Sequence, residues 1–316
     1  MPNSQPDTQP DSQPDSQPDS QPELQVIIAA PTPFGPDRSL DLAGVRTLLA
    51  RVASYGVDGV LVAGTNGEFV ALSDAERLAV VEAALEVWPN TDDVYAHVGA
   101  ATTYQAVALT RATVGLGARR LAALTPYYHP ASRQVVLDHF RAVADAAGGA
   151  PVYAYLFESL TNTRVDVELL AELATIPGLA GVKVSGQPVD AVAAYRAALP
   201  AEFAVYSGAD IDLARVHRVG GTGVVSGVST AFPAPFLDLA AAVRAGDDAA
   251  EKRAQAEVDT VVHALSGGVA SLKAALDLLG LPAGPVRVGV DPPSAREYEH
   301  IRQLTERRGS ATRNPS

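Results

Sequence analysis

The stretch Gly178-Leu179-Ala180-Gly181-Val182-Lys183-Val184-Ser185-Gly186 contains an apolar strand, bounded by glycines, with one lysine near its far end. An ammonium group between two valines is costly to bury unless a partner charge is present or the proton is lost. The chain has three lysines against 21 arginines, so arginine supplies most of its positive charge. Because lysine, unlike arginine, can lose its proton and attack a carbonyl carbon, Lys183 is a candidate Schiff-base nucleophile. The alternative is a lysine at the rim of a barrel that forms a salt bridge or reaches solvent.

The composition narrows the class of protein. The 316 residues are 47% hydrophobic, which is enough for one large core or two smaller ones. A net charge of −12 argues against nucleic acid or an anionic membrane as a partner. The chain contains no cysteine, and no apolar run reaches the roughly 18 residues that a membrane span needs. Because the N-terminus does not resemble a secretory signal, we expect a cytoplasmic protein.

The two ends of the chain differ from its middle. Residues 1–23 contain Gln5-Pro6-Asp7-Thr8 followed by three copies of Gln-Pro-Asp-Ser. Such a segment has nothing apolar to bury, so we expect a disordered acidic tail there. A flexible tail is also expected over residues 309–316, after the last predicted helix.

From residue 24 onward, short apolar runs alternate with helical segments. The runs predict eight strands, at residues 24–30, 59–63, 94–98, 119–124, 151–156, 179–184, 203–206 and 223–226. The predicted helices between and after them are residues 41–55, 73–88, 102–116, 132–147, 166–175, 189–199 and 211–219, and one that starts at Pro233 or Pro235 and ends at Arg244. Most runs are continuous rather than alternating, which is typical of parallel strands buried on both faces.

Eight strand–helix units over residues 24–245 predict an α/β fold, a (β/α)8 TIM barrel. A doubly wound open sheet is the alternative. After Gly246 the strand pattern stops, and three further helical segments, residues 247–265, 269–279 and 293–308, predict a C-terminal helical subdomain over residues 246–308.

In a barrel of this kind, the active groups lie at the carboxyl ends of the strands. The second predicted strand is followed by Gly64-Thr65-Asn66-Gly67-Glu68, which has the glycines, hydroxyl and amide of a compact anion-binding turn. Such a run is also typical of an ordinary turn. The fourth strand is followed by Pro126-Tyr127-Tyr128, and the fifth contains Tyr155 near its end. Tyrosines at these positions are commonly packing groups with one hydrogen bond.

Together these residues have the order and spacing of a known family. Residues 64–68, Pro126-Tyr127-Tyr128, Tyr155 and Lys183 resemble the motifs of the dihydrodipicolinate synthase and N-acetylneuraminate lyase superfamily of pyruvate-handling class I aldolases. The resemblance covers residues 25–298 and includes two later segments, Ser207-Gly208-Ala209-Asp210 and residues 223–226.

The resemblance implies a role for each catalytic candidate. Lys183 would attack the keto carbon of a 2-oxo acid, pyruvate in most members, and form an imine. Tyr155 would move protons to and from the substrate hydroxyl. Thr65 would connect Tyr155 to Tyr128, and the counterpart of Tyr128 reaches in from a neighbouring subunit, which implies a homo-dimer or homo-tetramer.

The family also implies a set of substrate contacts. The turn residues Gly64, Thr65, Asn66 and Gly67 would bind the pyruvate carboxylate. The other candidate substrate-binding residues are Val225 through its carbonyl group, Ser207, Leu160 and His129. Because the sequence contains no metal-ligand spacing and no nucleotide loop, we expect no metal and no cofactor.

The segment after Tyr155 departs from the lysine-pathway synthases of this family. Their pattern resembles Tyr-Asn-Val-Pro-x-Arg-Thr-Gly, whereas this chain has Tyr155-Leu156-Phe157-Glu158-Ser159-Leu160-Thr161-Asn162. Leu160 replaces the arginine that would hold the carboxylate of the second substrate, and leucine makes no such contact. Asn66 replaces a second threonine, and this resembles the aldolases of 4-hydroxy-2-oxoglutarate and of 2-keto-3-deoxy sugar acids.

We therefore expect a Schiff-base-forming lyase or aldolase that acts on a 4-hydroxy-2-oxo acid, with pyruvate and an aldehyde as its small-molecule partners. One alternative is the 4-hydroxy-tetrahydrodipicolinate synthase of the lysine pathway. The other is a non-catalytic barrel that binds a 2-oxo acid.

The remaining ionisable residues are interpreted as structural. Asp210 and Asp212 stand at the start of a predicted helix, where carboxylates are normal caps. Lys252 is expected on a solvated helix face, and Lys273 among the C-terminal helices, away from the strand ends. Of the six histidines, His129 alone is expected near the substrate.

Overall fold

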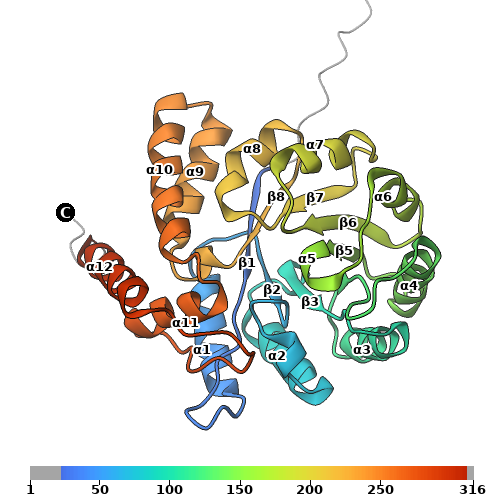
Figure 1. The fold of residues 1–316 in the computed structure, drawn as a ribbon, viewed down its shortest axis with the longest axis horizontal. Coiled ribbons are helices and arrows are strands. Elements are labelled where there is room, and N and C mark those ends of the chain that lie inside the picture. Colours follow the sequence, from blue (N-terminus) through green and yellow to red (C-terminus); the bar gives the residue numbers. More distant parts are fainter. Residues whose placement is uncertain (1–22, 312–316) are drawn as a thin grey trace, which may run out of the picture.

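The eight strands form a closed parallel barrel. In the computed structural model, which describes residues 23–311, neighbouring strands pair in chain order and the eighth closes the ring by pairing with the first (Figure 1). The strands are β1 (Gln25–Ala29), β2 (Gly59–Val62), β3 (Val94–His97), β4 (Arg120–Leu124), β5 (Val152–Leu156), β6 (Leu179–Val184), β7 (Ala204–Ser207) and β8 (Gly223–Ser226). The predicted (β/α)8 fold is therefore confirmed, and the alternative of an open sheet is wrong.

Helices follow the strands and cover the outside of the barrel (Figure 1). They are α1 (Leu42–Ala53), α2 (Asp74–Val87), α3 (Thr103–Gly115), α4 (Arg133–Ala146), α5 (Glu158–Thr161), α6 (Val167–Leu173), α7 (Val189–Ala197), α8 (Leu213–Arg218) and α9 (Pro233–Ala245). Four 3₁₀ turns lie in the connections: η1 (Phe69–Ala71), η2 (Thr91–Asp93), η3 (Asp210–Asp212) and η4 (Val228–Thr230). The one-turn helix α5 was not predicted, because four residues are too few to show a helical period.

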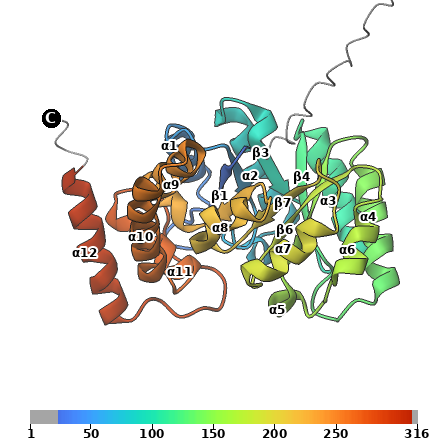
Figure 2. The same ribbon diagram turned by 90° about the horizontal axis from the view of Figure 1, so that it is seen from above.

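Three further helices follow the barrel: α10 (Asp248–Ala264), α11 (Val269–Leu278) and α12 (Ala295–Ala311). Figure 2 shows α10 and α12 at one end of the molecule and α3, α4 and α6 at the other. The helices predicted in this part of the chain are present, whereas the domain boundaries stay a prediction. The predicted tails lie outside the described residues over 1–22 and 312–316. Within the described part, no single helix is long and apolar enough to cross a membrane; α10 and α11 pass that test only as a pair bent by 105°.

Aromatic side chains fill the barrel towards the beginnings of its strands. Tyr95 on β3, Tyr153 on β5 and Tyr206 on β7 pack together inside, with the ring centres of Tyr95 and Tyr153 5.0 Å apart. Arg120, the first residue of β4, donates a hydrogen bond of 2.6 Å to the Tyr95 hydroxyl. Since the barrel interior is filled here, space for a substrate is left at the opposite end, where the strands finish.

The local sequence explains where helix α2 begins and ends. The Ser73 hydroxyl accepts a hydrogen bond from the Glu76 N–H, and the Glu76 side chain accepts one from the Ser73 N–H, as the capping box predicts. The helix ends before Trp88, the only tryptophan of the chain, which is buried. Because α2 starts after the carboxyl end of β2 and runs back towards the start of β3, Trp88 lies on the amino-terminal side of the barrel.

The predicted caps at the start of α8 are wrong. Asp212 occupies the cap position, but its side chain accepts no hydrogen bond from a backbone N–H of the described helix and instead forms an ion pair of 3.2 Å with the Arg215 side chain. Asp210 accepts a hydrogen bond from the Ser226 side chain at the end of β8. The Asp210 carboxylate therefore points towards the carboxyl end of the barrel and not along the helix.

Candidate active site

Lys183 and Tyr155 lie side by side on neighbouring strands. β5 and β6 pair so that Tyr155 is the register partner of Lys183, and the Lys183 Nζ lies 4.3 Å from the centre of the Tyr155 ring. Both side chains are buried. Because successive side chains point to opposite faces of a strand, Lys183 points into the barrel while Val182 and Val184 pack in the outer core.

Thr65 extends this pair into a cluster of hydroxyl groups. Its Oγ1 lies 3.2 Å from the Tyr155 hydroxyl, and the Ser185 hydroxyl, just beyond β6, donates to the same oxygen at 3.5 Å. The structure thus brings together Thr65, Tyr155 and Lys183, which the sequence singled out. Ser185 was not predicted, although its spacing of two residues from Lys183 on an extended strand was an available signal.

The turn after β2 is closed by its own backbone. The Glu68 N–H donates to the Thr65 carbonyl at 3.0 Å, and the Phe69 N–H donates to the Gly64 carbonyl at 3.3 Å. No carbonyl group in the described residues accepts a hydrogen bond from the N–H of Thr65 or Asn66. Both N–H groups are therefore available to an anion such as a carboxylate.

The glycines around the site are required by close approaches. A Cβ atom on Gly227 would lie 2.1 Å from the Asn66 Nδ2, so the Asn66 amide packs against the chain just after β8. A Cβ atom on Gly208, after β7, would lie 2.0 Å from the Ser185 Oγ and 3.2 Å from the Lys183 Cε. Any larger residue at either position would displace side chains of the site.

Two more of the predicted residues are buried at the ends of the last two strands. Ser207 ends β7, and its Oγ accepts a hydrogen bond of 3.0 Å from the Ala209 N–H. Val225 on β8 packs its side chain into the apolar cluster inside the barrel, beside Tyr206. The Val225 side chain is therefore part of the core, which leaves its carbonyl group as the predicted substrate contact, while the Ser207 hydroxyl keeps its O–H donor for a further partner.

Two ionisable groups near Lys183, the buried His97 and the half-buried Asp210, were not predicted. Burial raises the pKa of Asp210, and the Ser226 hydrogen bond and the Lys183 charge oppose that rise; its Oδ1 has no hydrogen-bond partner among the described residues. Burial and the charges of Arg77 and Lys183 hold the pKa of His97 well below its usual value, so its ring is neutral. The signal for Asp210 was its place directly after a strand.

Three predicted residues are exposed around the site. Tyr128 is 78% exposed, has a left-handed backbone with φ 79°, and packs its ring 4.9 Å from that of the exposed His129. Leu160, on α5, is 54% exposed. Within the described residues of one chain, no hydrogen bond connects Thr65 to Tyr128. The predicted hydroxyl chain therefore stops at Thr65 in a single copy of the protein.

The prediction that Lys273 lies away from the strand ends is wrong. Its Nζ forms a buried ion pair of 2.7 Å with Oε1 of Glu68, the last residue of the Gly64–Glu68 motif. The reason is the position of α11, which carries Lys273 to the end of β2. This contact could not be read from the sequence, because it depends on how the C-terminal helices pack against the barrel.

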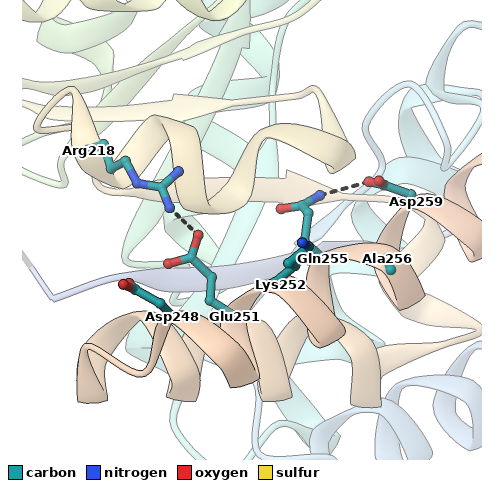
Figure 3. Close-up of a pocket in the computed structure, with 7 residues that line it drawn as sticks. All are labelled: Arg218, Asp248, Glu251, Lys252, Gln255, Ala256 and Asp259. Carbon is teal, nitrogen blue, oxygen red and sulfur yellow. Dashed lines mark hydrogen bonds and ion pairs between the residues drawn. The ribbon is translucent and has the colours of Figure 1, made fainter.

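Two surface clefts in the described part of the chain lie outside this cluster. One of about 540 Å³ lies between α8 and α10 and is lined by groups that pair with one another, such as Arg218 with Glu251 (Figure 3). Another of about 430 Å³ borders Glu158 and Gln187, after β5 and β6. In the described part of the chain, no group of three or more His, Asp or Glu residues could hold a metal ion.

The chain is similar to known proteins over most of its length. The model of the dihydrodipicolinate synthetase family matches residues 23–307. A 4-hydroxy-tetrahydrodipicolinate synthase of Moorella thermoacetica is 33% identical over 279 residues, which cover 88% of this chain and 95% of that protein. An uncharacterized DapA-like lyase of Halobacterium salinarum is 38% identical over 264 residues, 83% of this chain and 86% of that protein.

A solved structure supports the same relationship. YagE, a prophage protein of E. coli K12 whose crystal structure was determined in complex with pyruvate, matches with a TM-score of 0.82 at 25% identity, covering 90% of this chain and 98% of YagE. The family model and the relatives agree with the resemblance that the sequence motifs indicate. The chain therefore belongs to the dihydrodipicolinate synthetase family, and it is a class I, Schiff-base-forming lyase or aldolase.

Proposed function

We propose that this enzyme cleaves or forms a carbon–carbon bond in a 4-hydroxy-2-oxo acid, with pyruvate as the common partner. The candidate substrates are 4-hydroxy-2-oxoglutarate and 2-keto-3-deoxy sugar acids. The observation that carries the proposal is the cluster of one amine and two hydroxyl groups formed by the buried Lys183 and Tyr155 and the half-buried Thr65. The pyruvate complex of the related YagE supports the choice of the 2-oxo acid.

In this proposal Lys183 is the nucleophile and the turn after β2 is the anchor. The unprotonated amine attacks the keto carbon, a carbon–nitrogen bond forms, and the carbonyl oxygen leaves as water, which gives an imine. The free N–H groups of Thr65 and Asn66 would hold the neighbouring carboxylate. Protonation of the imine nitrogen then makes it an electron acceptor for the next step.

Tyr155 would carry out the proton transfer of the cleavage step. After giving its own proton to the imine nitrogen, Tyr155 accepts the proton of the C4 hydroxyl, the C3–C4 bond breaks, the aldehyde leaves, and the bonding electrons pass to the protonated imine to form an enamine. Protonation at C3 and hydrolysis by one water then release pyruvate and restore the Lys183 amine. The Thr65 and Ser185 hydroxyls, at 3.2 and 3.5 Å, hold the Tyr155 oxygen in place.

The second candidate function is 4-hydroxy-tetrahydrodipicolinate synthesis, which the names of relatives such as the Moorella protein support. Leu160 and Glu158 argue against it, because neither offers a positive charge to the carboxylate of aspartate semialdehyde. One lost charge-assisted hydrogen bond costs about 1.5–3 kcal/mol, which corresponds to a deficit of about ten- to hundredfold in rate. The third candidate is a barrel that binds a 2-oxo acid without turnover. Such a protein would form the imine on Lys183 but would not cleave the carbon–carbon bond.

We also infer that the working enzyme is a homo-dimer or homo-tetramer. Tyr128 exposes most of a large aromatic ring and has a left-handed backbone, which a non-glycine residue adopts only at a cost. Burial of this ring against a second copy of the chain would offset the cost of the strained backbone. In such an assembly the partner subunit's Tyr128 would continue the hydroxyl chain that ends at Thr65.

The test is a borohydride trap followed by a substrate panel. Incubation with pyruvate and borohydride should reduce the imine to a stable adduct on Lys183, detected by mass spectrometry. The rate of cleavage of 4-hydroxy-2-oxoglutarate and 2-keto-3-deoxygluconate should then exceed the rate of condensation of pyruvate with aspartate semialdehyde. No adduct would overturn the Schiff-base role of Lys183. Efficient condensation would favour the lysine-pathway function, and an adduct without any turnover would favour the binding barrel.

A further inference from the structure

The turn that carries Thr65 and Asn66 is bounded by two strained residues. Ala63 and Glu68 both have a left-handed backbone, with φ 51° and 56°. Residues with a side chain adopt this conformation at a cost, and it persists where the surrounding contacts determine it. A Cβ atom on Gly67 would lie 3.0 Å from the Ala63 Cα, so the turn is also tightly packed on itself. The contacts that fix the position of Glu68 therefore also stabilise the conformation of the turn.

Glu68 is held by the C-terminal part of the chain. Its Oε1 pairs with the Lys273 Nζ at 2.7 Å, and its Oε2 accepts hydrogen bonds from the N–H groups of Arg287 at 2.6 Å and Val288 at 2.9 Å. The side chains of Glu68 and Lys273 are 0% and 2% exposed. A buried carboxylate with one ion-pair partner and two N–H donors is fixed in position, and removing the lysine would leave an uncompensated charge.

Lys273 is itself fixed by two further contacts. Its Nζ donates to the Pro285 carbonyl at 3.0 Å and lies 4.1 Å from the centre of the Phe34 ring. In a chain that uses arginine at most positive positions, a lysine here fits a small buried site, because its ammonium is a compact point charge. The second anchor, Arg287, lies 4.2 Å over the same ring and donates to Glu76 on α2 at 2.7 Å. The helix α11 and the segment after it are thus tied to the turn at several points.

We propose that Glu68 and Lys273 are positioning residues which, through the strained turn, set the affinity of the site for the carboxylate of a 2-oxo acid. Neither side chain touches the substrate in this proposal; both act through Thr65 and Asn66. The inference rests on the proposed function, which assigns carboxylate binding to that turn. Its consequence is that α11, outside the barrel, contributes to substrate recognition.

Borohydride trapping at Lys183 with two ligands tests this role. Pyruvate has a keto group and a carboxylate, whereas hydroxyacetone has the keto group alone. In Lys273→Met and Glu68→Gln, the half-saturating concentration of pyruvate should rise about ten- to hundredfold, as expected when a binding group is misplaced. The rate of trapping with hydroxyacetone should stay unchanged. Lys252→Met, on α10 at the cleft of Figure 3, is the matched control and should keep both wild-type values.

A double variant keeps the test possible if a single variant does not fold. Glu68→Gln combined with Lys273→Met leaves no lone charge buried, and it should show the same selective loss of pyruvate affinity. A parallel loss with both ligands in a folded variant would reduce the pair to a structural role and overturn the proposal, as would an unchanged half-saturation for pyruvate. If the wild-type protein forms no adduct at all, the proposed function fails instead, before any variant is compared.

Discussion

The hydroxyl of Tyr155 lies 3.2 Å from the Oγ1 of Thr65, although the two residues are 90 positions apart in the chain. Tyr155 comes from β5, and Thr65 comes from the turn after β2. The Tyr155 side chain therefore faces both the Lys183 amine and the turn that is proposed to bind the carboxylate. Because the three groups come from three separate segments, the β2 turn, β5 and β6, each can be removed by mutation while the other two stay in place.

Replacing Lys183 by arginine should abolish the borohydride-trapped adduct with pyruvate. Arginine keeps a positive charge but does not lose its proton, so no neutral nucleophile remains. Intact-mass measurement after reduction checks this, with Lys252→Arg as a control that should trap as the wild type does. An adduct of the same mass in the Lys183 variant would place the nucleophile elsewhere.

Replacing Tyr155 by phenylalanine should separate imine formation from cleavage. The ring keeps its packing against Phe69 and Leu124, while the hydroxyl and its contacts to Thr65 and Ser185 are lost. We expect the pyruvate adduct to persist and turnover of the 4-hydroxy-2-oxo acid to fall by about 10²- to 10⁴-fold, the usual contribution of general acid–base catalysis. Steady-state cleavage rates and trapping yields on the same sample measure the two steps. Equal turnover in variant and wild type would rule out Tyr155 as the proton carrier.

Replacing Leu160 by arginine should improve the condensation of pyruvate with aspartate semialdehyde. The position is 54% exposed on α5, so a longer charged side chain is accommodated without repacking. One new charge-assisted hydrogen bond to the aldehyde's carboxylate predicts a gain of about ten- to hundredfold in kcat/KM. Leu160→Gln, which introduces a polar side chain without a charge, is the control. A wild-type protein that already condenses these substrates as fast as the arginine variant would contradict the substrate assignment.

The proposed subunit contact predicts that Tyr128 affects the state of association. Light scattering should give a dimer or tetramer for the wild type at micromolar concentration. Tyr128→Asp should dissociate it or weaken the association, because a buried unpaired carboxylate opposes an interface. Tyr104→Asp, at another highly exposed tyrosine, tests whether the effect belongs to Tyr128. A monomeric wild type would remove the shared hydroxyl chain from the mechanism.

His139 should make the protein less stable in mild acid. The residue is buried on α4, with its Nδ1 3.1 Å from the Thr103 hydroxyl, and burial lowers its pKa to about 4, whereas the pKa in the unfolded chain is near 6.5. Between these values the unfolded state takes up a proton that the folded state does not. The contribution to stability is therefore complete above pH 6.5 and falls as the pH drops to about 4, by about 3 kcal/mol in all.

Urea unfolding at pH 7 and pH 4.5 measures this loss. His139→Gln cannot take up a proton, so the unfolding free energy of the variant should fall less between the two pH values than that of the wild type. His97 remains in both proteins and contributes equally to each. An identical fall in both proteins would show that His139 is not the titrating group.

The strand–helix order could be predicted, and Lys183 could be singled out as a candidate nucleophile, because their signals are local. Continuous apolar runs predict the buried strands, and Ser73 with Glu76 predicts the start of α2. Lys183 stands out within its own strand. Ser185 and Asp210 were missed since each was judged by its immediate neighbours, and the ion pair of Glu68 with Lys273 was missed because it depends on tertiary packing.

The position of Trp88 makes its fluorescence a signal of unfolding and not of ligand binding. The helix α2 is about 20 Å long and runs from the turn beside Thr65 to Trp88, so the tryptophan lies far from the ligand and inside the core. We therefore expect its fluorescence to report the opening of the barrel and to stay constant when pyruvate binds. Thermal denaturation followed by tryptophan fluorescence, with and without pyruvate, would then measure how much the ligand stabilises the fold. Pyruvate would change this fluorescence only by shifting the folding equilibrium.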